Sequence, residues 1–221
     1  MKYILSFGGG VNSTALLFFL IDNNFPLDEI IFADTGAELP ETYKHINKIQ
    51  EFCKRNKIKF TIVKNEVGIY EWYWKHKKIP TWNRRSCTDI FKIRPIRRYL
   101  KERYSKEKFV MYIGISYDER QRAKKSNVKY IKNRYPLIEN GIDRKRCEKI
   151  IISHGFKVPP KSGCYFCPFQ PEERWEWLLK NYPLLFQKAK ALEENGSAYP
   201  KLTLSRRGPL KNILLLSEVR R

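Results

Sequence analysis

The chain has 221 residues, and its 44 Lys and Arg against 23 Asp and Glu give a formal net charge of +21. This length is sufficient for one large or two small domains with a buried core. No apolar run approaches the roughly 18 residues that a membrane span needs. The start of the chain leads into a strand pattern rather than a signal peptide. We therefore expect a cytoplasmic protein with no membrane partner.

The positive charge is spread along the chain, and in several stretches it alternates with aromatic residues. Basic side chains can contact phosphates and aromatic rings can stack on bases, so this pattern favours a nucleic-acid partner. The stretches are residues 70–78, Arg84 with Arg85, and residues 92–103. The alternatives are a general lysine bias, or a site for small nucleotide anions only.

Apolar periodicity predicts alternating strands and helices in the first part of the chain. The expected strands are residues 3–7, 28–34, 59–63 and 109–115, and the expected helices are residues 12–22, 40–52 and 92–104. Strand, helix and strand in succession predict a parallel sheet covered by helices. The fold class is therefore α/β, with a Rossmann-like nucleotide-binding domain over residues 1–135.

Beyond residue 135 the strand signals stop and helical patterns dominate. They cover residues 144–154, 172–180 and 183–194, with a cysteine-bearing loop between the first two. We expect residues 136–221 to form a smaller, mostly helical region that carries a metal or cluster loop.

The first expected strand runs into a glycine-rich turn and then into a helix. Three glycines allow close approach of the backbone to a phosphate, and the helix N-terminus adds N–H donors and partial positive charge. Ser13 and Thr14 add hydroxyl donors. The spacing fits neither the Walker A motif nor the dinucleotide fingerprint. The candidate anion-binding residues are Ser6, Gly8, Gly9, Gly10, Asn12, Ser13 and Thr14.

Open α/β sheets bind ligands beyond the carboxyl ends of their strands. Asp34, Thr35 and Gly36 lie at the end of the expected second strand. Gly114 and Ser116 lie at the end of the expected strand over residues 109–115. We expect these segments to share one nucleotide-sized site with the glycine turn. Arg120 and Arg122 follow, and guanidinium groups suit bidentate phosphate recognition.

Five cysteines in a basic chain without a signal peptide favour a metal or catalysis over disulfides. Cys164 and Cys167 form a C-x-x-C pair, and Cys87 and Cys147 could complete four ligands. Four thiolates suit either Zn²⁺ or a [4Fe–4S] cluster, between which spacing cannot choose. A redox-active Cys164/Cys167 pair is a further alternative. Cys53, in a periodic helix, is expected to be a buried apolar side chain.

The glycine turn resembles the pyrophosphate loop of the PP-loop ATP-pyrophosphatase (HUP) superfamily, whose pattern is Ser-Gly-Gly-x-Asp-Ser. Gly9, Gly10 and Ser13 match this pattern, whereas Gly8 replaces its Ser and Asn12 replaces its Asp. The resemblance implies ATP with Mg²⁺ as ligands. It also implies adenosine-side contacts at Asp34 and Thr35, and reactive-site roles for Asn12, Ser13 and Arg120.

Residues 32–42, 86–95 and 161–169 resemble the phosphoadenosine phosphosulfate (PAPS) reductase-like family, including phage and prokaryotic proteins and a DNA phosphorothioation component. That resemblance implies a [4Fe–4S] cluster at Cys87, Cys147, Cys164 and Cys167, with Zn²⁺ as the alternative. Residues 205–221 contain no Cys or His, whereas the reductases use a Glu-Cys-Gly-x-His segment there.

The resemblance therefore implies an ATP-dependent sulfurtransferase that adenylates and thiolates a nucleic acid, tRNA or DNA, with a possible sulfur-donor protein. One alternative is a reductase that converts PAPS or adenylyl sulfate to sulfite. Another is a nucleotide- or nucleic-acid-binding protein that has lost catalysis, which Asn12 in place of Asp would favour.

Overall fold

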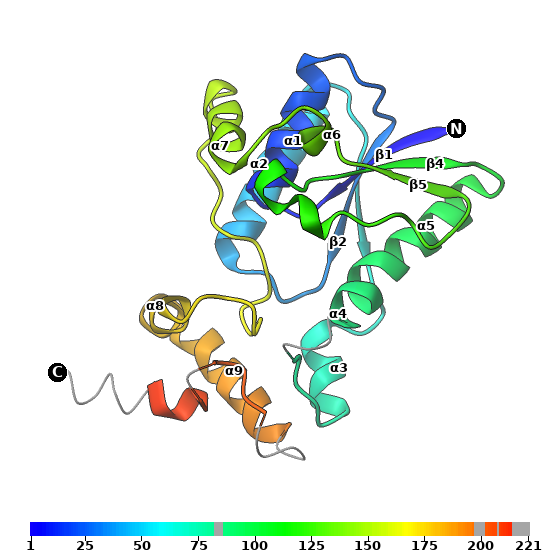
Figure 1. Ribbon diagram of the computed structural model, residues 1–221. Coiled ribbons are helices and arrows are strands. Elements are labelled where there is room, and N and C mark those ends of the chain that lie inside the picture. Colours follow the sequence, from blue (N-terminus) through cyan, green and yellow to red (C-terminus); the bar gives the residue numbers. More distant parts are fainter. Residues whose placement is uncertain (82–85, 197–201, 207, 214–221) are drawn as a thin grey trace. The chain divides into compact units, whose positions relative to one another are not determined.

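The computed structural model describes residues 1–81, 86–196, 202–206 and 208–213 (Figure 1). The chain divides into two compact units. The first comprises residues 1–33, 39–63 and 95–162, and the second comprises residues 34–38, 64–94 and the described residues from 163 onward. The division thus differs from the expected boundary at residue 135. Helix α7 (Arg144–Ser153) belongs to the first unit because it buries Cys147 and Ile151 in that unit's core.

A five-stranded sheet forms the centre of the first unit. Its strands are β1 (Lys2–Phe7), β2 (Glu29–Asp34), β3 (Phe60–Lys64), β4 (Phe109–Ile113) and β5 (Ile131–Arg134). Their order is β3-β2-β1-β4-β5, and β1 pairs in parallel with both β2 and β4. Phe7, the last residue of β1, lies beside Phe32, so β2 runs two residues beyond the end of β1. The parallel α/β expectation is confirmed.

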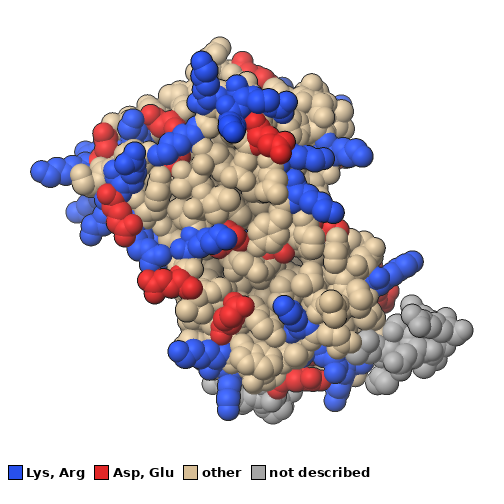
Figure 2. Space-filling model, turned by 180° about the vertical axis from the view of Figure 1, so that it is seen from behind, with Lys and Arg blue, Asp and Glu red and all other residues tan. Residues whose placement is uncertain are grey.

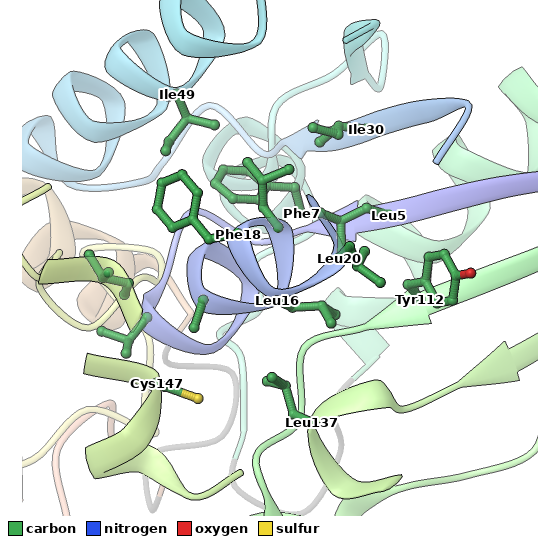
Figure 3. Close-up of a cluster of buried hydrophobic side chains, with 14 of the residues drawn as sticks. Leu5, Phe7, Leu16, Phe18, Leu20, Ile30, Ile49, Tyr112, Leu137 and Cys147 are labelled. Carbon is green, nitrogen blue, oxygen red and sulfur yellow. The ribbon is translucent and has the colours of Figure 1, made fainter. Parts of the chain in front are cut away.

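Helices cover both faces of this sheet (Figure 1). On one face α1 (Val11–Asp22), α2 (Pro40–Arg55) and α7 pack their apolar side chains against the strands. Figure 3 shows this core, in which Leu16 and Phe18 of α1 lie near Leu5 and Phe7 of β1. On the other face α5 (Arg94–Tyr104) contributes Ile96 and Leu100 to a second cluster. A short helix, α6 (Pro136–Glu139), follows β5.

The second unit is mainly helical in its described residues. Its elements are α3 (Ile69–Lys75), α4 (Ser86–Thr88), a π-helical turn η1 (Asp89–Ile93), α8 (Glu173–Asn181) and α9 (Pro183–Asn195). The buried Glu193 carboxylate of α9 accepts the backbone N–H groups of Leu204 and Leu210 at 2.7 Å each. This carboxylate binds Leu204 and Leu210 to helix α9.

Two local features differ from the sequence-based expectation. The helix expected over residues 92–104 is divided into η1 and α5, and π-turns of this kind are common at functional sites. Strand β5 was not expected, because in Ile131–Arg134 only Ile131 is buried. An edge strand with one buried residue carries almost no apolar signal.

None of the helices in the described part of the chain is long and apolar enough to cross a membrane.

A buried carboxylate marks the amino-terminal edge of the sheet. Glu29 is fully buried and accepts hydrogen bonds from Thr61 Oγ1 at 2.5 Å, Tyr99 OH at 2.7 Å and Tyr104 OH at 2.5 Å. Lys59 Nζ lies 3.1 Å from its Oε1. Burial alone would raise the pKa of Glu29, but these hydrogen bonds outweigh burial and lower it. The ionised carboxylate is therefore the form that stabilises the fold.

Glu29→Gln should lower the free energy of unfolding by about 1–3 kcal/mol at pH 7, because it removes charge-assisted bonds from a buried site. A lowered folded-state pKa gives stability that is present above the unfolded value of 4.5 and is lost as pH falls through the folded value. The gap between wild type and variant should therefore shrink below pH 4.5. Urea unfolding at pH 7 and pH 4 measures this difference in the free energy of unfolding. An equal difference at both pH values would contradict the stabilising role of the ionised Glu29 carboxylate.

Candidate functional site

The glycine turn of the first unit joins the central strand β1 to the N-terminus of α1. Gly9 has φ +69°, and a Cβ there would lie 3.1 Å from Thr42 Cγ2. Helix α1 begins directly after Gly10, whose carbonyl accepts Thr14 N–H at 3.0 Å. Geometry leaves the first N–H groups of a helix without an intrahelical acceptor. The first turn of α1 contains no acidic side chain, so it suits an anion.

Two hydroxyls of this helix start act mainly within the fold. Ser13 Oγ accepts the Gly10 N–H at 3.3 Å. Thr14 Oγ1 is fully buried, donates to the Gly10 carbonyl at 2.9 Å and lies 2.8 Å from His45 Nε2. Burial lowers the pKa of His45 to about 4, so this imidazole is neutral near pH 7. Thr14 thus supports the turn instead of facing a ligand, in contrast to the expectation for its hydroxyl.

Gly114, at the end of β4, lies against the start of α1. A Cβ on Gly114 would be 2.8 Å from both the N and the Cα of Ser13, and 2.9 Å from the Asn12 carbonyl carbon. These are backbone atoms that cannot rotate away. Only glycine allows this approach, which brings the segment after β4 to the glycine turn as the sequence predicts.

Asn12 links the turn to that segment. Its Nδ2 donates to Ser116 Oγ at 3.0 Å and to Glu119 Oε2 at 3.0 Å. Its Oδ1 accepts from Arg144 Nη1 at 3.4 Å. Asn12 and Ser116 are both buried. Position 12 is therefore the centre of a polar network that sequence reasoning did not describe.

The two predicted arginines lie on the turn η2 (Tyr117–Arg122), which follows this network. Arg120 is exposed, donates to the Tyr117 carbonyl at 3.4 Å and stacks 4.7 Å from the centre of the Tyr117 ring. Arg122 forms an ion pair with Glu119. Both guanidinium groups belong to the first unit, as the glycine turn does.

Three residues near the turn were missed. Arg144 begins α7, and its backbone N–H donates to Asp118 Oδ1 at 3.0 Å. Glu119 was present in the sequence segment but was not assigned a role. Ser162 Oγ lies 2.6 Å from the position that a Cβ on Gly10 would occupy. Arg144 and Ser162 lie far along the chain from the turn, and no motif connects them to it.

In the second unit, the turn after β2 is held by its own side chains. Gly36 has φ +76°, and its N–H donates to Asp34 Oδ1 at 2.9 Å. Lys64 Nζ lies 2.9 Å from Asp34 Oδ2. Asp34 thus stabilises the turn and pairs with a lysine, which is the structural role that an acidic residue after a strand can also play.

The same unit holds three of the four predicted ligand cysteines, Cys87, Cys164 and Cys167, all partly buried. Thr35 Oγ1 lies 3.5 Å from Cys164 Sγ. Burial raises the pKa of Tyr73, which hydrogen-bonds to Cys87 and lies within electrostatic range of Cys164. Cys87 and Cys164 therefore both lie near Tyr73.

A lysine and a buried carboxylate complete this region. Lys92 Nζ contacts Glu38 Oε1 at 3.0 Å. Burial alone would lower the pKa of Lys92, but the charges of Glu38, Cys164 and Cys167 outweigh burial and raise it. Burial is the largest cause that raises the pKa of the Cys164 thiol, and the negative charge of Glu38 raises it further. Within the described residues, Glu38 Oε2 is buried without a hydrogen-bond partner. We call Cys87, Cys164, Cys167, Lys92 and Glu38 the thiol cluster.

Cys147 does not share this region. Its side chain is fully buried in the core of the first unit, where Figure 3 shows it near Leu137 and Leu16. Burial raises the pKa of its thiol to about 12. This is the environment of an apolar side chain and argues against the expected role as a fourth ligand. Cys53 is also fully buried, as expected.

In the part of the chain that the structure describes, no three His, Cys, Asp or Glu side chains are arranged around a common metal position. Arg84 and Arg85, which form one of the basic stretches expected to contact a nucleic acid, lie outside the described residues.

The sequence model of the phosphoadenosine phosphosulfate reductase domain matches residues 2–188. The chain belongs to this family. The match begins with β1 and ends within α9, so it includes the glycine turn, the network around Asn12 and the thiol cluster.

Curated relatives of this PAPS reductase family chain include two uncharacterized proteins of Methanocaldococcus jannaschii. They are 24% and 27% identical, over 84% and 83% of this chain and 40% and 45% of their own lengths. An uncharacterized nin region protein of Escherichia phage lambda is 26% identical, over 59% of this chain and 54% of its own length. The chain spans about half the length of these relatives.

Solved structures share the fold. A phosphoadenylyl-sulfate reductase from Candida auris, in a phosphate complex, superposes with a TM-score of 0.53 at 16% identity, over 74% of this chain and 81% of that one. The U34-tRNA thiolase NcsA from Methanococcus maripaludis, with its [4Fe-4S] cluster, superposes with a TM-score of 0.51 at 16% identity, over 89% and 72%. At this identity the likeness concerns the fold.

Proposed function

We propose that this PAPS reductase family protein is an ATP-dependent sulfurtransferase that thiolates a nucleic acid. The observation that carries the proposal is the thiol cluster, whose three partly buried cysteines belong to the unit that also contains the turn after β2. NcsA, a thiolase of the same fold, carries a [4Fe-4S] cluster.

The nucleotide would bind at the glycine turn. In this reaction an acceptor oxygen of the nucleic acid attacks the α-phosphorus of ATP, and pyrophosphate leaves. A sulfide nucleophile then forms the new bond to carbon, and AMP leaves with the oxygen. The first N–H groups of α1 would hold the pyrophosphate, and Arg120 and Arg122 would offset its charge. Mg²⁺ would accompany the triphosphate.

The chemistry of the thiol cluster fits an iron–sulfur centre in part. Cys87, Cys164 and Cys167 are soft ligands, and the Lys92 ammonium would offset the charge of thiolates. With Cys147 in the core, these are three protein ligands rather than four. A bound cluster would supply a soft iron site for sulfur. Zn²⁺ is the alternative metal for the same thiols.

A nucleic-acid acceptor is favoured by charge. Lys and Arg side chains are spread over the face in Figure 2, and the net charge is +21. Such a surface attracts polyanions and gives binding that weakens as salt rises. A sulfur-donor protein would supply the sulfide.

The test is an anaerobic incubation of the protein with ATP, Mg²⁺, sulfide and either total tRNA or duplex DNA, followed by mass spectrometry of the digested nucleic acid. The proposal predicts a sulfur-containing nucleotide in one of the two pools, dependent on ATP. Omitting ATP is the control. No sulfur in either pool, while PAPS yields sulfite, would favour the reductase.

A further inference from the structure

Asn12 occupies the position where the PP-loop pattern has an acid, and its partners explain why an amide stands there. One side of the Asn12 amide faces Glu119, and the other faces Arg144. An ionised carboxylate can only accept hydrogen bonds and a guanidinium can only donate them. An amide is able to serve both. These partners also determine which atom of the amide is Nδ2 and which is Oδ1.

Glu119 in turn uses both of its carboxylate oxygens. Its Oε2 accepts from Asn12 Nδ2 at 3.0 Å, and its Oε1 is paired with the guanidinium of Arg122. Glu119 therefore connects Arg122 to the first turn of α1 through a single side chain. Charge-assisted bonds of this kind fix geometry as well as adding energy.

We propose that Glu119 is a positioning residue that holds Arg122 at the phosphate turn, and that Asn12 is the partner that makes this possible. The inference rests on the proposed nucleotide role of the turn. Aspartate at position 12 would place two carboxylates in contact at about 3 Å, where both cannot remain ionised without cost. The Asn at position 12 is thus part of a working site and not a sign of lost catalysis.

The proposal can be tested with a charge exchange between positions 12 and 119. Asn12→Asp breaks the bond to Glu119. In Glu119→Gln, the amide oxygen accepts from Asn12 Nδ2, so the amide N–H₂ faces the guanidinium of Arg122. Both of these groups are hydrogen-bond donors, so the bond between residue 119 and Arg122 is lost. In the double variant, the new amide N–H₂ at position 119 donates to the new carboxylate at position 12, and its oxygen accepts from Arg122, so the connection is restored. Glu139→Gln removes a similar exposed ion pair, with Arg134, from the same unit and serves as the control.

ATP affinity is measured by calorimetric titration in the presence of Mg²⁺, together with the melting temperature without nucleotide. We expect each single variant to bind ATP about tenfold or more weakly, the double variant to recover to within about threefold of wild type, and the control to bind as wild type does. A tighter-binding Asn12→Asp variant would overturn the proposal. So would recovery of melting temperature without recovery of affinity, because the network would then be only structural.

Failure of the proposed function gives a different result. If the wild-type protein binds no ATP or PAPS, the nucleotide role of the turn is wrong, and the positioning role falls with it. If the wild type binds nucleotide and the double variant stays as weak as the single ones, only the positioning role of Glu119 is wrong.

Discussion

Gly114→Ala is expected to abolish nucleotide binding. The new Cβ would lie 2.8 Å from the N and Cα of Ser13, and real Cβ atoms do not approach backbone atoms so closely. The end of β4 and the start of α1 must therefore separate, which displaces the first N–H groups of α1 and the Asn12 network. Overpacking of this kind costs about 1–3 kcal/mol of folding stability. Affinity for ATP, measured by calorimetric titration, should fall below detection.

A matched glycine separates this effect from general destabilisation. Gly155 follows α7 with φ +76°, and a Cβ there would have no atom within 4 Å, so alanine brings backbone strain without a clash. Gly155→Ala should lose stability and retain ATP binding. If both variants bind ATP equally well, the close approach at Gly114 does not shape the nucleotide site.

Cys164→Ser should remove the proposed metal centre. Cys164 is central to the thiol cluster, since it lies beside Thr35 and interacts electrostatically with Lys92, Glu38 and Cys167. A hydroxyl is a poor ligand for iron or zinc in such a site. Iron, sulfide and zinc analysis after anaerobic purification measures the effect, and the bound metal should fall to near zero.

The core cysteines are the controls for this variant. Cys53→Ser and Cys147→Ser each bury a hydroxyl in an apolar core and should cost about 1–3 kcal/mol of stability with metal content unchanged. If the Cys147→Ser variant lost its metal, Cys147 of the wild-type protein would be a fourth ligand. Loss from both Cys164→Ser and Cys53→Ser would undo the ligand assignment as a whole.

The α/β fold could be predicted because its signals are local. Each central strand is a short run of apolar residues between turn residues, and β2, with all six residues buried, is the clearest case. The turn of Gly8, Gly9 and Gly10 could be predicted for the same reason, since strand, glycines and helix start are consecutive. Strand β5 could not, because only Ile131 is buried there.

The parts of the site that were missed depend on contacts between distant segments. Arg144 reaches Asn12 only because α7 packs against α1 in the folded chain. The same packing buries Cys147, which was expected to help complete the four ligands. Spacing identified the C-x-x-C pair, but it could not show which of the other cysteines lies in the same unit.

Sulfur transfer to an activated acceptor and reduction of a sulfonucleotide place different demands on the same nucleotide site. In the proposed site both reactions would use the glycine turn, and both suit a family whose members share this fold. They differ in which bond of the nucleotide is broken, since transfer cleaves ATP between the α and β phosphates and reduction releases sulfite from PAPS.

The most direct measurement incubates the anaerobically purified protein with ATP in one reaction and with PAPS in a parallel one. Each reaction also contains Mg²⁺, nucleic acid, sulfide and a thiol. The amounts of AMP, pyrophosphate and sulfite formed are then measured. Sulfur transfer predicts AMP and pyrophosphate in equal amounts from ATP, dependent on nucleic acid and sulfide, and no sulfite from PAPS. Sulfite from PAPS, with no pyrophosphate from ATP, would contradict it.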